Sequence, residues 1–430
     1  MTRRLCKRFA VNCALWSESC RRRWFTINPS RAFMPVIDET KQAEVDPLEH
    51  TPLHTLLVAT NRLQSLPTVL VVLALLFNGA LVALAAAAYT LDAAALTVIG
   101  YAVAAAANWL LLALLPRTGR SYGPDKPSAL ALSALFALLL CALALLRAPW
   151  WLGWGMLAAA TAIVFYSTWI EPFRLGVTRQ SYTTARWQNG APPLRLLQVG
   201  DIHVERVTPR ERHLNRLIAE LQPDIIVFTG DFVNLSNTHD PEAEKAIREI
   251  IGQWRAPLGV YCVSGTPLVE PLERVKDFVR GLDNLKLLPN QWMTINTPGG
   301  PLNILGLVVT HDMDKDRALL RKMMLTAPKD GLHLLLMHPP DIAPEANEAG
   351  IDLYLCGHTH GGQIRLPLVG PIFSSSHLGN RFIMGRYELG RTTLYTARGV
   401  GLEGLGAPRA RFRCPPEIVL WEIGGDERVG

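Results

Sequence analysis

Four long apolar runs dominate the hydropathy pattern of the first half of the chain. Each is about 20 residues long, the length that spans the hydrocarbon core of a bilayer, and none has a charged residue in its interior. The runs are Pro67–Tyr89, Ala93–Leu115, Ser128–Leu146 and Pro149–Ile170. Because a globular core rarely supplies four such segments in succession, the pattern predicts a multi-pass anchor of four transmembrane helices within residues 67–170.

The residues around these runs predict their orientation. Tryptophans flank the fourth run as an interfacial belt would, and the loop of residues 116–127 and the segment after Ile170 are both rich in arginine. The loop of residues 90–92 carries no positive charge, and that of residues 147–148 carries one. By the positive-inside rule, the N-terminus and the C-terminal domain should both lie on the cytoplasmic side of the inner membrane.

Polar residues within the runs are few. Asn78 and Asn108 are the only amides there, and such residues commonly bond a neighbouring helix. We therefore expect the helices to act as an anchor in the lipid bilayer and not as a transport path.

After a juxtamembrane linker at residues 171–193, the hydropathy pattern changes to short strands alternating with amphipathic helices. Helical periodicity is found at Arg210–Gln222, Asp240–Trp254, Leu268–Gly281 and Asp314–Leu325, and short strands follow from Gly362 to Ile423. This alternation is typical of an α/β fold, which we assign to residues 194–430.

Four apolar strands in this domain are each followed by side chains that can bind metal. Carboxyl ends of strands are where open α/β sheets place their ligands, and imidazole with carboxylate suits Mn, Fe or Zn better than Mg or Ca. Glycines on both sides of the last pair allow a sharp turn close to a small ligand. The candidate metal ligands are Asp201, His203, Asp231, His338, His358 and His360.

The order of these motifs (Asp-x-His, Gly-Asp, a late His, Gly-His-Thr-His) resembles the calcineurin-like metallophosphoesterase superfamily, over roughly residues 194–423. The stretches 361–367, 397–401 and 414–417 look like its bacterial, membrane-anchored branch. The resemblance implies a four-layer α-β-β-α sandwich that binds two divalent metal ions. It implies one ion held by Asp201, His203 and His360, a bridging Asp231, and a second ion held by His338 and His358.

Such a pair of ions implies phosphoester hydrolysis. Two cations about 3.5–4 Å apart clamp the attacking and leaving oxygens of an in-line displacement at phosphorus, and a water that bridges them becomes a hydroxide nucleophile.

One motif departs from the family pattern. Where the family carries Gly-Asn-His-Asp or Gly-Asn-His-Glu, this chain has Thr266 and Pro267 after Gly265. Thr266 replaces an expected Asn ligand, and Pro267 replaces a His that would stabilise the transition state or protonate the leaving group. His311 is either a substitute for that missing imidazole or a solvent-facing loop residue.

Two classes of function follow. The first is an active phosphodiesterase or pyrophosphatase that hydrolyses a lipid-linked phosphoester at the cytoplasmic membrane face. The second is a metal-binding pseudoenzyme or membrane scaffold that lost catalysis with Thr266 and Pro267. Arg365, Arg398 and Arg409 follow the metal motifs and either grip phosphate oxygens or have a structural role.

The net charge and the cysteine content add little to the functional prediction. The net charge of +6 depends on a basic stretch at residues 1–33, which is followed by an acidic stretch up to residue 66. The basic stretch is either an arm on the membrane surface or untranslated sequence before a start at Met34, so we infer no nucleic-acid partner. The seven cysteines include no Cys-x-x-Cys pair, which fits a reduced compartment.

Overall fold

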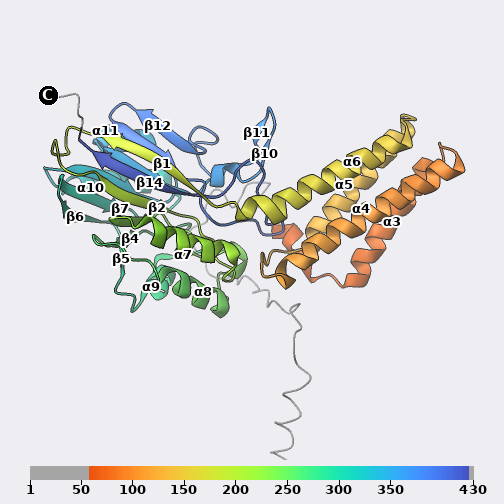
Figure 1. Ribbon diagram of the computed structural model, residues 1–430, viewed down its shortest axis with the longest axis horizontal. Coiled ribbons are helices and arrows are strands. Elements are labelled where there is room, and N and C mark those ends of the chain that lie inside the picture. Colours follow the sequence, from red (N-terminus) through yellow and green to blue (C-terminus); the bar gives the residue numbers. More distant parts are fainter. Residues whose placement is uncertain (1–57, 426–430) are drawn as a thin grey trace, which may run out of the picture. The chain divides into compact units, whose positions relative to one another are not determined.

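The computed structural model describes residues 58–425 (Figure 1). The expectations for the basic and acidic stretches, apart from residues 58–66, and for a start at Met34 lie outside the described residues. The described residues all belong to one compact unit.

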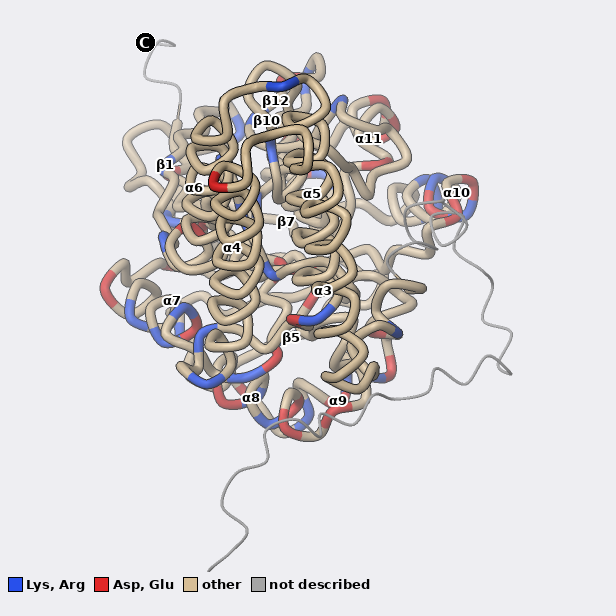
Figure 2. Tube along the Cα trace, turned by 90° about the vertical axis from the view of Figure 1, so that its right-hand side faces the viewer, with Lys and Arg blue, Asp and Glu red and all other residues tan. Residues whose placement is uncertain are grey.

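Within residues 58–425, four helices are long and apolar enough to cross a membrane. Figure 2 shows them almost without charged residues, whereas Lys, Arg, Asp and Glu are frequent on α7 to α10. The short helix η2 (Arg62–Ser65) precedes them, and the last span continues through a π-helical turn and the short helix η4 to Phe173. The helices are α3 (Thr68–Ala86), α4 (Leu91–Arg117), α5 (Lys126–Leu145) and α6 (Trp150–Phe165).

Polar contacts between these helices confirm the expectation for both asparagines. Asn78 donates to the Ser133 hydroxyl at 2.9 Å, and Asn108 donates to the Thr161 hydroxyl at 2.8 Å. Each bond therefore joins two helices, as expected where lipid offers no alternative partner.

Two six-stranded mixed sheets form the C-terminal domain. The first has the order β1-β14-β2-β3-β4-β5 and the second the order β12-β13-β9-β8-β7-β6. The first comprises β1 (Gly176–Thr183), β2 (Leu194–Val199), β3 (Ile225–Phe228), β4 (Val260–Cys262), β5 (Leu285–Leu287) and β14 (Glu417–Gly424). The second comprises β6 (Gln291–Thr297), β7 (Gly300–Gly306), β8 (Leu332–Leu336), β9 (Leu353–Cys356), β12 (Gly385–Leu389) and β13 (Thr392–Thr396).

Three apolar clusters show that the two sheets pack face to face with helices on both outer faces. The inner cluster combines residues of both sheets, such as Leu196 and Leu334. A second cluster packs α7 (Pro209–Leu221), α8 (Pro241–Ile251) and α9 (Leu272–Val279) on the first sheet. A third packs α10 (Met313–Met324) and α11 (Ala343–Ala349) on the second sheet. The expected α-β-β-α sandwich is confirmed.

Two differences from the expected boundaries affect the architecture. Helix α9 begins at Leu272 instead of Leu268, because Pro271 caps its N-terminus and residues 266–270 form a separate turn. The expected linker, residues 171–193, contains β1, which pairs in parallel with β14 along its whole length. Trp187, in the same stretch, is buried in the core between the sheets. The domain therefore begins before residue 194.

Candidate metal centre

The loops after β2, β3, β8 and β9 bring all six expected metal ligands together. The ligand atoms form two groups, within each of which they lie no more than 4.8 Å apart. Asp231 belongs to both groups, and all six side chains are buried. The first group is Asp201, His203, Asp231 and His360, and the second is Asp231, His338 and His358.

In the first group, the Nε2 atoms of His203 and His360 lie 2.8 Å apart. Asp231 Oδ2 lies 3.4 Å from His203 Nε2, and Asp201 Oδ1 lies 3.8 Å from His360 Nε2. Two imidazole nitrogens and two carboxylates thus converge on one small volume.

The second group likewise combines imidazole nitrogens with a carboxylate. His338 Nε2 lies 3.0 Å from Asp231 Oδ2 and 3.1 Å from His358 Nδ1. The Thr266 hydroxyl lies 3.4 Å from both Asp231 Oδ2 and His338 Nε2. The replaced motif residue therefore still faces the second group, at its half-buried edge.

These donors fit metal ions. Each group has a pair of imidazole nitrogens at close range, and such a pair can share one proton or bind one cation in its place. Asp201 Oδ2 is buried and finds no hydrogen-bond partner within residues 58–425, so it has a lone pair to give. The mixture of nitrogen and carboxylate donors is the set preferred by Zn, Mn or Fe.

Second-sphere contacts orient three of the rings. His203 Nδ1 lies 2.8 Å from the Glu403 carboxylate, and His338 Nδ1 lies 2.8 Å from the Thr229 carbonyl. In His358 the two ring nitrogens exchange roles: Nε2 is the outer nitrogen and lies 3.0 Å from the Ser375 carbonyl. Each acceptor holds a proton on the outer nitrogen and leaves the inner nitrogen free for a cation.

His360 is supported differently. Its Nδ1 atom faces Arg411 Nη2 at 3.3 Å, and a guanidinium can only donate. Arg411 is fully buried and also donates to the carbonyls of Arg398 and Gly401. Within residues 58–425, the outer nitrogen of His360 therefore has no acceptor like those of the other three rings.

The backbone of the site is strained. Asp201, His203, Asp231, His358 and His360 all have φ between 40° and 71°, in the left-handed region that non-glycine residues seldom adopt. Such strain gathers where a functional arrangement requires it.

Two glycines are required by close approach. A Cβ atom at Gly265 would overlap the Asp231 carboxylate, and one at Gly357 would overlap that of Asp201. Gly265 therefore leaves room for the Asp231 carboxylate, and Gly357 leaves room for that of Asp201.

Glu270 supports the loop that carries Asp231, a role the sequence did not reveal. Its carboxylate accepts hydrogen bonds from the backbone N–H groups of Gly265 (2.7 Å), Asp231 (2.9 Å) and Phe232 (2.7 Å). Burial and the nearby Asp231 charge raise the pKa of Glu270 to about 8. Glu403 was missed too, since both glutamates act through contacts with distant parts of the chain.

Protons compete for the same nitrogens. Burial lowers the pKa of His203, but Glu403 and Asp231 outweigh it and raise the pKa to about 9. For His338, the Asp231 charge likewise outweighs burial and raises the pKa to about 9. Burial and neighbouring cationic groups instead lower the pKa of His358 and His360, so only part of the cluster retains protons without a cation.

His311 is not a solvent-facing loop residue, so that alternative is wrong. It is 2% exposed, and its ring centroid lies 5.2 Å from that of His358. His377 lies beyond it, with ring centroids 6.3 Å apart. Pro267, in contrast, is half-buried beside Thr266 and brings no titratable group.

The arginines that follow the metal motifs have structural partners. Arg398 pairs with Glu417 at 2.5 Å, and buried Arg409 pairs with Glu205 at 2.8 Å. Arg365 donates to the Gly361 carbonyl at 2.8 Å.

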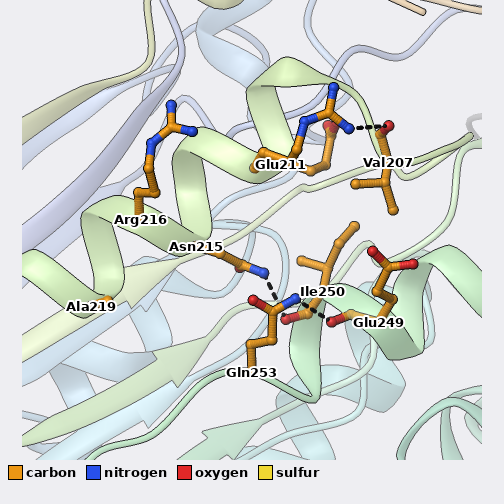
Figure 3. Close-up of a pocket in the computed structure, with 9 residues that line it drawn as sticks. Val207, Glu211, Asn215, Arg216, Ala219, Glu249, Ile250 and Gln253 are labelled. Carbon is orange, nitrogen blue, oxygen red and sulfur yellow. Dashed lines mark hydrogen bonds between the residues drawn. The ribbon is translucent and has the colours of Figure 1, made fainter.

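A shallow groove between α7 and α8 is separate from this centre (Figure 3). Its volume is about 400 Å³, and its polar side chains bond to nearby backbone, as Asn215 does to the Ile250 carbonyl. It contains none of the six ligands.

Comparisons with known proteins agree with this geometry. Residues 194–362 match the family described as calcineurin-like phosphoesterase. The uncharacterized metallophosphoesterase YkuE of Bacillus subtilis is 28% identical over 60% of this chain and 88% of its own length. Phosphodiesterase YaeI of Escherichia coli is 27% identical over 60% of this chain and 92% of its own.

A third relative is UDP-2,3-diacylglucosamine pyrophosphatase LpxG of Chlamydia trachomatis. It is 26% identical, over 62% of this chain and 94% of its own length. With the two mixed sheets and the two His/Asp clusters, these matches support a calcineurin-like metallophosphoesterase domain that includes residues 194–362.

Proposed function

We propose that the protein is a metal-dependent phosphoesterase whose site holds two divalent ions, Mn, Fe or Zn. The observation that carries the proposal is the convergence of six buried ligands in two groups that share Asp231. When bound, such ions activate water and neutralise charge on a phosphoryl group.

The side chains divide this work. Asp201, His203 and His360 bind at the first position, and His338 and His358 bind at the second. Asp231 lies between the groups, where its charge offsets the repulsion between two cations. Glu403, Thr229 and Ser375 fix the ring orientations, so that little reorganisation is needed when substrate binds.

Two residues take over from the missing motif. The Thr266 hydroxyl, 3.4 Å from His338 Nε2, supplies the oxygen at the second position where the family has an amide. His311, which packs beside His358, supplies the imidazole that protonates the leaving group.

The substrate class follows from the anchor and the relatives. The four apolar helices hold the site close to a bilayer, and one relative is a pyrophosphatase of a diacylated sugar nucleotide while another is a phosphodiesterase. We infer a lipid-linked phosphodiester or pyrophosphate, hydrolysed at the cytoplasmic face. The arginine-rich loops support that side of the membrane.

A second candidate is a metal-binding pseudoenzyme that serves as a membrane scaffold. The observation in its favour is Pro267, which can neither bind metal nor transfer a proton. The two candidates differ in turnover but not in metal content.

The deciding experiment is hydrolysis of bis-p-nitrophenyl phosphate by the full chain in detergent, loaded with Mn²⁺. We would compare wild type with His358→Ala, with His311→Ala and with a Thr266→Asn, Pro267→His double variant. His239→Ala is the matched control, because that histidine is exposed.

We expect turnover by wild type and by His239→Ala, and loss of about 100-fold or more in His358→Ala and His311→Ala. Turnover by the double variant alone would establish the pseudoenzyme instead. Equal activity of His311→Ala and His239→Ala would remove His311 from the mechanism.

A further inference from the structure

Residues 364–373, which we call the apolar hairpin, form a small two-stranded unit directly after the last metal ligand. Its strands are β10 (Arg365–Leu366) and β11 (Gly370–Pro371), drawn in Figure 1 as a separate short pair. Large apolar side chains cover it on the outside. Their exposed fractions are 43% for Leu366, 108% for Leu368, 73% for Val369, 61% for Ile372 and 42% for Phe373.

This concentration is unusual for the domain. Among described residues after position 170, only two other large apolar side chains are strongly exposed, Leu268 and Leu325. Single exposed leucines are ordinary on protein surfaces, but a contiguous apolar patch marks a site of interaction. An isolated two-stranded hairpin is also marginally stable in water, so it gains from a partner.

The base of the apolar hairpin is joined to the end of the fourth membrane helix. The Arg365 N–H donates to the Phe412 carbonyl at 3.0 Å, and the Phe412 ring packs edge-on against Tyr166, with centroids 6.4 Å apart. The neighbouring Arg411 N–H donates a hydrogen bond to the Ser167 carbonyl at 2.9 Å, in the helical turn that extends the fourth membrane helix.

Positive charge borders the same junction. Arg174 and Arg413 are exposed, and Arg174 donates to the Tyr166 hydroxyl at 3.1 Å. Cationic residues beside apolar ones are the pattern that binds the anionic headgroups and upper acyl region of a leaflet.

We propose that the apolar hairpin inserts into the interfacial layer of the bilayer that anchors the chain, in the leaflet next to the domain. The occupant of this apolar surface is thus lipid, argued from its continuity with the membrane helix and from the adjoining arginines.

The insertion bears on the metal centre, because a metal ligand precedes the apolar hairpin and a residue that orients another ligand follows it. His360 lies four residues before it, and Ser375, whose carbonyl holds the His358 ring, lies two residues after it. A Cβ at Gly362 would overlap Pro371, so the hairpin packs closely on the ligand loop. The loop that carries His360 is therefore held at the lipid surface.

This consequence rests on the proposed function and defines its substrate more narrowly. The substrate is a phosphoester whose lipid chain stays in the bilayer while its phosphate enters the metal centre.

The first test measures insertion without activity. Leu368→Cys would be labelled with an environment-sensitive fluorophore in the full chain, with Cys6, Cys13, Cys20 and Cys141 replaced by Ser. The protein would be reconstituted in phosphatidylcholine–phosphatidylglycerol vesicles. Leu325→Cys is the matched control, since Leu325 is also a strongly exposed leucine, 86% exposed, but lies at the end of α10.

We expect blue-shifted emission at position 368 and quenching by lipids with brominated acyl chains. Position 325 should show aqueous emission that is quenched by iodide. Aqueous emission at both positions would overturn the insertion.

The second test compares two substrates, soluble bis-p-nitrophenyl phosphate and hexadecyl p-nitrophenyl phosphate dissolved in the vesicles. A Leu368→Asp, Val369→Asp variant should lose about tenfold or more on the lipid substrate, because two apolar side chains no longer enter the bilayer. It should keep its rate on the soluble substrate, and Leu325→Asp should keep both.

The outcomes separate the two proposals. Equal loss on both substrates, or no loss on the lipid substrate, would overturn the role of the hairpin in substrate access. Failure of wild type to hydrolyse either substrate would overturn the proposed function, while the fluorescence result would still decide the insertion.

Discussion

At the residue scale, the metal centre depends on groups that never reach a metal position. Glu403 is the clearest example, since its carboxylate accepts the outer N–H of His203 and also receives the Leu235 backbone N–H at 3.1 Å. Partners of this kind set ring orientation and ligand basicity.

We therefore expect Glu403→Gln to weaken metal binding about 10- to 100-fold while leaving the fold intact. The measurement is a metal titration monitored by competition with a chelating dye. Glu422→Gln is the control, because Glu422 is exposed on β14. Equal affinities of the two variants would show that the His203–Glu403 contact does not support the site.

Proton competition gives a second expectation at this scale. Because the pKa values of His203 and His338 are raised to about 9, both rings are protonated in the metal-free protein below that pH. A cation must displace these protons, so metal affinity should rise with pH up to about 9. The slope should approach about 100-fold per pH unit, for two protons released.

Titration with Zn²⁺ at several values between about pH 6 and pH 8 checks this slope. Glu403→Gln should reduce it, because that variant removes the charge that raises the pKa of His203 most. A metal affinity independent of pH would contradict both assignments.

At the element scale, β1 is the feature that sequence patterning missed. Its residues alternate only weakly between apolar and polar, and its partner β14 lies more than 200 positions later in the chain. Tyr182 on β1 and Trp187 in the turn that follows are both buried in the core, at 8% and 2% exposed.

A fragment of residues 192–425 should consequently be less stable than one of residues 174–425. The loss should be at least about 3–5 kcal/mol, the typical cost of deleting one buried Trp side chain. Urea unfolding followed by circular dichroism measures the difference, and Trp187→Ala in the longer fragment separates the tryptophan from the strand. Coincident unfolding curves of the two fragments would show that β1 is dispensable.

The elements that sequence patterning predicted well share one property. Strands β2, β3, β8 and β9 are short apolar runs that end in a ligand, so hydrophobicity and chemistry coincide within a few residues. The helices α3 to α6 were predicted equally well, because the thickness of a bilayer sets the length of an apolar run that spans it.

The features that sequence patterning could not predict depend on contacts between distant parts of the chain. Glu270 and Glu403 resemble ordinary surface acids until the fold brings them to the metal loops. The burial of His311 and the exposure of the apolar hairpin arise in the same way, from packing and not from local pattern.

At the scale of the whole molecule, the orientation of the anchor decides which compartment the metal centre serves. The charge distribution of the loops predicts a cytoplasmic domain. Thr90 and Thr118 provide a matched pair of probes, since both are exposed residues at the two ends of α4.

Cysteines at these positions should react differently with a membrane-impermeant maleimide. We expect labelling of Thr90→Cys in intact cells, and of Thr118→Cys only after the membrane is opened, in a chain without Cys6, Cys13, Cys20 and Cys141. The reverse pattern would place the metal centre on the outer side.

The short connection between anchor and domain has a kinetic consequence. The Glu171 side chain is buried against Cys414 at the end of the last membrane helix, and β1 begins only five residues later, at Gly176. If the substrate stays in the bilayer, as proposed above, an enzyme tethered this closely to its anchor encounters it by lateral diffusion. Its rate should then follow the surface density of substrate in the bilayer, so dilution with inert lipid would slow it while dilution with buffer would not.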